Sequence, residues 1–379
     1  MLFEYHSARA QRRGSLSNIK YWLGFSLIPE IGPKRLAALL NYFDSLPDAW
    51  QASESQLVQA GLEKQAISNL QRGRTRLDLD VELERIHKEG ARLLTLADGD
   101  YPALLKEQSD APVVLYVRGT LSPADDQALS IVGTRKATPY GRDAAHYLAK
   151  QLAAHNVTVI SGLAHGIDSA AHRGALDGGG RTLAVMGSGI DLVYPRNHER
   201  FAQEIASQGA LISEFPLGTP PEARNFPRRN RVISGMALGV LVVEAPETSG
   251  ALITASIAAD QGRDVFAVPG NIFNPMSSGN NRLIQEGAKL VMHVNDILDE
   301  LRIVHDAVQT RTITRRLVPS NPVEAQIARY LGADPLHIDD IVRLCGLPVA
   351  EVSSTLTILE LKGLVRNIGA MQYCLSEPH

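Results

Sequence analysis

The stretch from Glu222 to Ile233, EARNFPRRNRVI, holds side chains suited to binding a phosphate backbone and a base. Four arginines surround one phenylalanine, Phe226: Arg224, Arg228, Arg229 and Arg231. Guanidinium groups match phosphate oxygens in bidentate geometry, and an aromatic ring offers a face on which a base can stack. The stretch therefore predicts a loop that binds single-stranded nucleic acid. A solvated charged loop is the alternative reading of the same residues.

The composition requires any such site to be local. The chain has 379 residues and a net charge of −3, with 44% apolar and 21% charged residues, as in an ordinary globular protein of two or three domains. A slightly acidic chain does not coat nucleic acid by general positive charge. Its two cysteines, Cys345 and Cys374, make neither a disulfide framework nor a metal site. With no signal peptide and no run long enough to span a membrane, we expect a cytoplasmic protein without a membrane partner.

The region around the arginines alternates between apolar runs and helical segments. The predicted strands are Leu129–Val132, Val157–Ile160, Thr182–Val185, Ala210–Ile212, Gly239–Val243, Val265–Ala267 and Lys289–Val291. The predicted helices are Gly141–Ala154, Gly166–Leu176, Asn197–Ser207, Ala251–Asp260 and Asn280–Glu286. Buried β-branched runs separated by helices are typical of a mostly parallel sheet covered on both faces. We expect an α/β, Rossmann-like domain over residues 106–302.

Small and basic residues follow several of these strands, where such sheets bind ligands. Arg135 stands between a strand and a helix start, where an anion is favoured, although it could instead pack on the sheet edge. Arg196 follows Tyr194-Pro195, and Ser249-Gly250 caps a helix as an anion cradle would. The full set of predicted DNA-binding residues is Gly133, Arg135, Ser161, Gly162, Gly187, Arg196, Arg224, Phe226, Arg228, Arg229, Asn230, Arg231, Ser249 and Gly250.

Motifs for other chemistries are missing from the sequence. It has no G-x-G-x-x-G, no P-loop lysine and no G-x-S-x-G elbow, so we predict no cofactor and no enzyme. His165, Asp168 and His172 share a predicted helix and imitate metal ligands. A helix-capping aspartate and packed histidines are commoner, and no metal is predicted.

The N-terminal flank is predicted to be a disordered tail over residues 1–17, followed by a helical domain over 18–105. Gly32-Pro33 fits a turn between two helices, and a second such pair is expected near Leu57–Leu70. A helix-hairpin-helix that holds phosphate at its turn and a plain helical bundle both remain open.

A polar linker over 303–321 is predicted to lead into a C-terminal domain, residues 322–379. Helices at Val323–Leu331, His337–Cys345 and Val349–Lys362, followed by a two-stranded ribbon, predict a winged helix. The last of these helices carries two glutamates and no arginine, which favours protein interaction or regulation over sequence-specific DNA reading.

A set of motifs in order resembles one family: GTR at Gly133–Arg135, SGLAHGIDSAAH, MGSGIDLVYP, SEFP, FPRRNRVISG, VVEAPETSGALITA, GRDVFAVPGN and NRLIQEGAKL. This is the DNA-processing protein A family (DprA, also called Smf). The resemblance implies a Rossmann-like domain that binds single-stranded DNA and forms a homodimer, with a SAM-like helical domain before it and a winged helix after it. It also implies loading of RecA onto incoming DNA covered by SSB during natural transformation.

The resemblance also assigns residues. Arg135 matches the family's arginine after G-S/T, and Arg196 stands where the family has a basic residue. Phe226 matches the phenylalanine of Phe-Pro, and Arg229–Arg231 match its R-N-R element. Arg224 departs from the pattern, because the family often has a lysine there at a different spacing.

The rival reading is an enzyme similar to the nucleotide phosphoribohydrolases, which share this type of sheet. Those proteins carry P-G-G-x-G-T-x-x-E at a helix start, whereas EAPETSGALITA has no glutamate at that offset. A transcription factor that reads DNA with the winged helix is the third reading.

Overall fold

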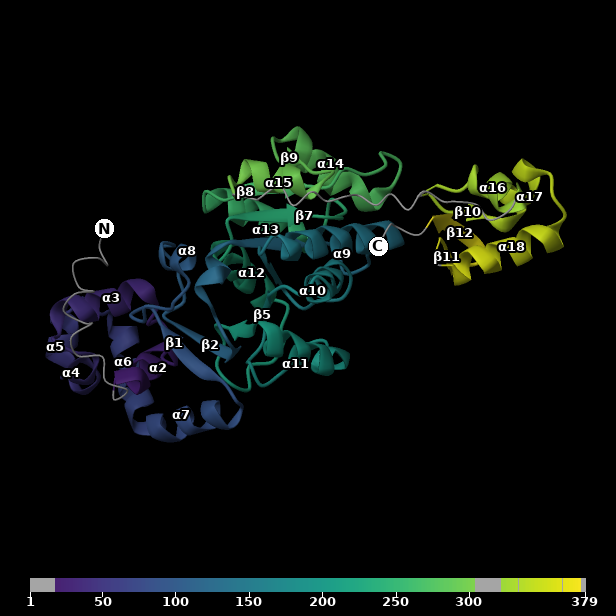
Figure 1. Cartoon of the computed structure of the whole chain (residues 1–379). Coiled ribbons are helices and arrows are strands. Elements are labelled where there is room, and N and C mark those ends of the chain that lie inside the picture. The colour runs from purple at the N-terminus through teal and green to yellow at the C-terminus, as the bar shows by residue number, and fades with distance from the viewer. Residues whose placement is uncertain (1–17, 304–321, 333, 363, 376–379) are drawn as a thin grey trace. The chain divides into compact units, whose positions relative to one another are not determined.

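The computed structural model describes residues 18–303, 322–332, 334–362 and 364–375, and the chain forms two compact units divided after Val304 (Figure 1). The predicted tail over 1–17 and nearly all of the predicted linker over 303–321 lie outside the described residues.

The first unit is built on a nine-stranded sheet, counted over the described residues, with the order β1-β2-β6-β5-β4-β3-β7-β8-β9. In chain order the strands are β1 (Arg92–Thr95), β2 (Val114–Gly119), β3 (Ala128–Val132), β4 (Thr158–Ser161), β5 (Thr182–Met186), β6 (Ala210–Ser213), β7 (Gly239–Val242), β8 (Asp264–Ala267) and β9 (Lys289–Leu290). The strands from β6 to β9 in that order pair parallel, while β2 pairs antiparallel with both β1 and β6. The mostly parallel α/β sheet is confirmed, although β1 lies in a segment predicted to be helical.

Helices cover both faces of this sheet. They are α9 (Pro139–Ala154), α10 (Ile167–Asp177), α11 (Glu199–Gln208), α12 (Asn225–Gly235), α13 (Gly250–Asp260), α14 (Ser278–Gln285) and α15 (Val294–Glu300). One apolar cluster joins α9, α10 and α15 to side chains such as Ile131 and Val159. A second cluster joins α12 and α13 to Ile160 and Val242 on the other face. Successive side chains of a strand point to opposite faces of the sheet, so they pack alternately against the two helix layers.

The predicted arginine-rich loop is wrong in its secondary structure, because these residues form helix α12. Val232, Ile233 and Met236 are buried and supply the apolar side of the helix. Pro227 lies in the first turn, where the missing backbone N–H is tolerated. Because Arg228, Arg229 and Arg231 lie in α12, the helix fixes the direction in which each side chain leaves the backbone.

From residue 18 onward, where the structure describes the chain, seven helices precede or join this sheet: α2 (Ile19–Ser26), α3 (Pro33–Tyr42), α4 (Leu46–Gln51), α5 (Glu54–Gln59), α6 (Lys64–Arg76), α7 (Leu79–Lys88) and α8 (Ala103–Lys106). The helical N-terminus is confirmed. Pro33 opens α3 as predicted, but the left-handed residue of the turn is Glu30, with φ 73°, and not Gly32. Phe25 and Trp50 meet edge to face at 5.1 Å in a core that continues into β1 and β2.

The second unit is a winged helix, as predicted. It contains α16 (Pro322–Ala328), β10 (Leu336–His337), α17 (Ile338–Cys345), α18 (Val349–Leu361), β11 (Val365–Gly369) and β12 (Gln372–Leu375), with the strand order β10-β12-β11. Gly346 ends α17 in the left-handed region, with φ 66°, which glycine adopts without strain. Its core is separate from those of the first unit and includes Ile341, Leu356 and Leu359.

In the described parts of the chain, no single helix is long and apolar enough to cross a membrane. Only α17 and α18 taken together, with a bend of 113° between them, reach that length and composition.

Candidate nucleic-acid interface

The candidate site lies at the carboxyl ends of the parallel strands. Gly133–Arg135 follow β3, Ser161-Gly162 end β4, and Gly187 follows β5. Because parallel strands end at the same edge of a sheet, these segments share one edge with the start of α12, which follows β6.

Phe226 is the centre of this group. It lies in the first turn of α12, half-buried, and its ring covers Gly187 so closely that an added Cβ at Gly187 would stand 2.7 Å from Cδ1 of the ring. The guanidinium carbon of Arg135 lies 4.8 Å from the ring centroid, and the ring of Tyr194 lies 5.9 Å away. We call these four residues the Phe226 platform. It combines an aromatic face with a solvent-exposed cation.

Arg229 lies beneath the platform and is buried, with 4% of its surface exposed. Its Nη1 donates to the carbonyl oxygen of Gly162 at 2.8 Å and to that of Val185, and its guanidinium carbon lies 5.9 Å from the Phe226 ring. Burial lowers the pKa of Arg229 to about 10, partly offset by the nearby Asp168. This arginine therefore ties the ends of β4 and β5 to α12 and supports the phenylalanine from below.

Arg231 points to a different part of the unit. It forms an ion pair with Glu214 and donates to the backbone oxygen of Asp110 at 2.6 Å, and 18% of its side chain is exposed. Burial raises the pKa of Glu214, against the opposing effect of the Arg231 charge. Asn230, between the two arginines, accepts a hydrogen bond from Nε of Arg229 at 3.2 Å.

The exposed cations of the predicted set are Arg135, Arg196, Arg224 and Arg228. Arg224 precedes α12 and pairs with Glu222 at 2.6 Å, and Arg228 lies 5.4 Å from the ring of Phe215. An exposed ion pair of this kind is weak and exchanges readily for a phosphate.

The remaining predicted residues have structural contacts. Ser161 is buried and donates to the backbone oxygen of Ile131 at 2.6 Å. Gly133 has no room for a side chain, because a Cβ would lie 2.4 Å from Ile167. Ser249 and Gly250 belong to the start of α13, where the Ser249 hydroxyl accepts the N–H of Ala251 at 3.3 Å.

Glu244 is an important residue that the sequence analysis did not single out. It follows β7 with 1% of its surface exposed, and its carboxylate accepts hydrogen bonds from the N–H of Thr138 at 2.7 Å and from its hydroxyl at 2.6 Å. It thereby fills the positive N-terminal end of α9, beside the point where the chain leaves β3 and β7 in opposite directions. Nucleotide-binding sheets hold a phosphate at such a helix start. The signal in the sequence was an acidic residue directly after a predicted strand.

Asp168 and His172 are buried, and their side chains form hydrogen bonds inside the protein. The carboxylate of Asp168 accepts the N–H groups of Gly162 at 3.1 Å and Ala164 at 3.3 Å, and burial raises its pKa. Burial lowers the pKa of His172 to about 3, and its Nδ1 lies 2.7 Å from the hydroxyl of Thr182. Over the residues that the structure describes, no group of three His, Cys, Asp or Glu side chains is arranged to hold a metal.

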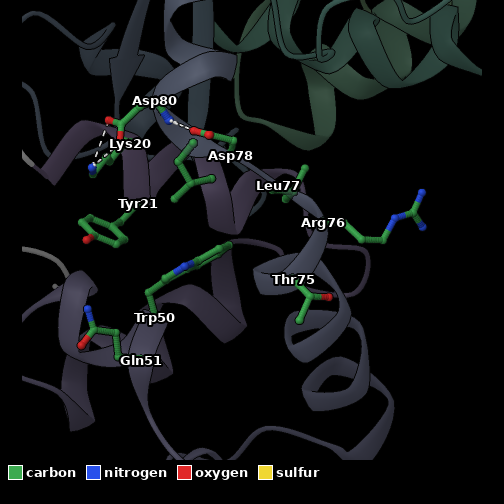
Figure 2. Close-up of a pocket in the computed structure, with 10 residues that line it drawn as sticks. Lys20, Tyr21, Trp50, Gln51, Thr75, Arg76, Leu77, Asp78 and Asp80 are labelled. Carbon is green, nitrogen blue, oxygen red and sulfur yellow. Dashed lines mark hydrogen bonds and ion pairs between the residues drawn. The ribbon is translucent and has the colours of Figure 1, made fainter.

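A hollow of about 470 Å³ lies among the N-terminal helices, away from the sheet edge (Figure 2). Tyr21 and Trp50 line it, and Figure 2 shows Arg76 pointing away from it. Lys20 is paired with Asp80 at 2.8 Å, so its charge is already neutralised. The hollow does not have the character of a phosphate site.

The architecture defines an α/β protein with a Rossmann-like core and a winged helix, and comparison with known proteins agrees with it. The family model described as DNA recombination-mediator protein A matches residues 92–302, and that of the DprA winged helix domain matches residues 314–369. The chain belongs to the DNA recombination-mediator protein A family, which confirms the resemblance.

Similar proteins include Protein Smf of Synechocystis sp., 34% identical over 93% of this chain and 98% of that protein. DNA processing protein DprA of Bacillus subtilis is 40% identical over 58% of this chain and 74% of that protein. The X-ray structure of DprA from Streptococcus pneumoniae has a TM-score of 0.66 at 32% identity, covering 74% of this chain and 97% of that one. A DprA structure from Helicobacter pylori, described for its single-stranded DNA binding mode, has a TM-score of 0.50 at 27% identity over 56% of this chain and 95% of that one.

Proposed function

We propose that this protein binds single-stranded DNA at the Phe226 platform. The observation that carries the proposal is the half-buried ring of Phe226 beneath the exposed guanidinium of Arg135, at 4.8 Å. An aromatic ring with an exposed cation over its face suits one base and its phosphate, because the guanidinium can move aside to the phosphate as the base stacks. The similarity to the Helicobacter pylori protein supports the same ligand.

In this proposal the exposed arginines of the set hold phosphates: Arg135, Arg196, Arg224 and Arg228. Phe226 stacks a base, and the small residue Gly187 lets the ring lie close to the end of β5. Recognition is then largely independent of sequence, because phosphates and aromatic faces carry no base code. Arg229 and Arg231 act as positioning residues, since carbonyl groups and Glu214 already occupy their guanidinium groups; direct phosphate contact by either one remains a prediction.

The wider role proposed here follows the family. The protein would protect incoming single strands and load RecA onto them in competition with SSB, during transformation or recombination in the cytoplasm. A homodimer through the Rossmann-like domain would offer two platforms to one strand and gain avidity. It would act without catalysis: the segment EAPETSGALITA, which leads into α13, has no glutamate at the offset where the rival phosphoribohydrolases carry one.

The test compares Arg135→Ala and Phe226→Ala with the unchanged protein, using fluorescent dT oligonucleotides and the matching duplex over a salt series. We expect the unchanged protein to prefer the single strand, with a log–log salt slope of about −0.7 for each phosphate contact. Phe226→Ala should weaken binding roughly 5- to 150-fold, the range for one stacked base. Arg85→Ala is the matched control, because this arginine is exposed on α7 and paired with Glu82. Equal binding to duplex, or unchanged binding by both variants, would rule the proposal out.

A further inference from the structure

A groove of about 400 Å³ lies beside the Phe226 platform and has not yet been assigned a role. Its walls come from α9, from the start and first turns of α10, and from the segment around the start of α11. The side chains that line it are mainly basic or aromatic: Arg142, His165, Ser169, Arg173, His198 and Phe201. We call it the α9–α10 groove.

The groove retains hydrogen-bond donors for an anion. Arg142 is exposed and donates from Nη1 to the backbone oxygen of Ala137 at 2.5 Å, which occupies one of the five N–H donors of a guanidinium. Arg173 lies over the Phe201 ring at 4.6 Å and pairs with Glu204 at 2.7 Å. Asp168, which precedes Ser169, is buried and bonded to backbone N–H groups, so it does not face the groove as a free charge. Asp143 and Glu199 adjoin the lining residues Arg142 and His198 in sequence.

Two histidine rings also line the groove. The rings of His165 and His198 meet edge to face, with centroids 4.6 Å apart. Nδ1 of His198 lies 3.0 Å from the backbone oxygen of Leu163, an acceptor, so this nitrogen carries the hydrogen and Nε2 of the neutral ring is an acceptor. The exposed ring of His165 offers a second flat face beside it.

The groove is continuous with the Phe226 platform. Gly166, on its wall, packs so closely on the β3–α9 segment that a Cβ there would lie 2.3 Å from the oxygen of Thr134 and 2.8 Å from that of Arg135. On the other side, Arg196 and His198 belong to the same short helical turn, Arg196–His198, which directly follows Tyr194-Pro195. The walls of the groove therefore adjoin the segments that carry Arg135 and Tyr194 of the platform.

We propose that the α9–α10 groove binds the phosphodiester backbone of the same single strand, beyond the nucleotide stacked on Phe226. The proposal rests on the proposed function and extends its footprint. Arg142 donates hydrogen bonds to phosphate oxygens, and His165 packs against a sugar or a base. A linked phosphate enters the groove at a high effective concentration once the platform is occupied, so the groove adds affinity only for strands long enough to reach it.

The experiment measures affinities for a series of dT oligonucleotides of increasing length with Arg142→Ala, His165→Ala and the control Arg85→Ala. We expect both groove variants to bind the shortest oligonucleotides as the unchanged protein does and to lose the gain in affinity with length. For a long oligonucleotide, Arg142→Ala should also make the log–log salt slope shallower by about 0.7. His165→Ala keeps the test valid should Arg142→Ala lower the melting temperature.

An unchanged length dependence and salt slope in both variants would overturn the proposal, as would an equal loss for short and long oligonucleotides. Inorganic phosphate at matched ionic strength is expected to leave the gain with length intact; its removal by phosphate would mean that the groove is a site for a free anion. Failure of the proposed function has a different signature, because the shortest oligonucleotides would then be unaffected by Phe226→Ala.

Discussion

Contacts with Gly187 and Arg229 position the ring of Phe226, in addition to helix α12. Gly187 contacts the ring directly. Arg229 is buried next to it and donates hydrogen bonds to the carbonyl groups of Gly162 and Val185. An arginine in this position has no freedom to follow a moving phosphate. It gives the aromatic ring a fixed height above the sheet edge, so that the ring needs little ordering when a base arrives.

Substitution of Gly187 tests whether the close contact between this residue and the Phe226 ring matters for binding. In Gly187→Ala, the new methyl group would lie 2.7 Å from the Phe226 ring, which must then tilt or move away. We expect weaker binding to dT oligonucleotides with little change in melting temperature, because the ring is half-buried and can move toward solvent. Gly179→Ala is a comparison glycine with open space around it, although its φ of 71° adds strain there. If Gly187→Ala binds dT oligonucleotides as tightly as the unchanged protein, binding does not require the Phe226 ring to contact Gly187.

The sequence predicted residue types at this site better than their contacts. Arg135 and Phe226 lie together as a site for a strand requires, but the sequence did not reveal that Arg229 and Arg231 are engaged inside the protein. Their partners are carbonyl groups and Glu214, from segments far away along the chain. Such engagement depends on tertiary packing, which no local pattern of arginines encodes.

At the scale of elements, α10 is held to the sheet by a buried histidine whose protonation state matters. Thr182 donates its hydroxyl hydrogen to the backbone oxygen of Val159 at 2.8 Å, so it accepts from Nδ1 of His172 and leaves Nε2 without a proton. Nε2 has no hydrogen-bond partner among the described residues, and burial lowers the pKa of His172 to about 3. A second proton on this ring would be a buried charge close to Arg229.

This arrangement predicts a pH-dependent stability. The folded pKa of His172 lies below the unfolded value of 6.5, so the stabilisation is complete above pH 6.5 and is lost as the pH falls toward 3. Relative to His172→Gln, the unchanged protein should lose about 1.4 kcal/mol of unfolding free energy for each pH unit in that window. Urea unfolding at several pH values measures the difference, in which the opposite effects of Asp168 and Glu214 cancel because both variants contain them. Parallel pH profiles would mean that the pKa of His172 in the folded protein equals its unfolded value.

The elements themselves were predicted where their pattern is strong. Strands β3 to β8 are continuous apolar runs between helices, a pattern that is typical of buried parallel strands. Strand β1 has four residues and is flanked by helical sequence, so only its pairing with β2 defines it. The sequence did not predict helix α12, because Pro227 and three charged side chains interrupt the apolar pattern of Val232, Ile233 and Met236.

At the scale of the whole molecule, the two units have separate cores, and every residue proposed to touch DNA lies in the first. The winged helix is stabilised by its own packing and by the ion pair of Lys362 with the buried Glu324, at 2.7 Å. Its α18 carries no arginine, in keeping with the interpretation that the wing serves protein contacts.

A chain ending at Val304 should therefore keep the affinity of the full chain for dT oligonucleotides and its preference over duplex. The reason is that the Phe226 platform, the α9–α10 groove and the cores beneath them are all retained. Fluorescence anisotropy on both chains at one salt concentration makes the comparison, with circular dichroism to check folding. A large loss of affinity in a folded, truncated chain would mean that the winged helix contributes phosphate contacts.

Glu244 has a consequence for how this protein persists in a cell. Sheets of this class that carry a nucleotide at the corresponding helix start gain stability in proportion to how far the nucleotide concentration exceeds its dissociation constant. Here the anion at the start of α9 is a side chain of the protein itself. The amount of folded protein is then independent of nucleotide supply at this position, so starvation that depletes nucleotides leaves the sheet edge assembled and ready for a strand.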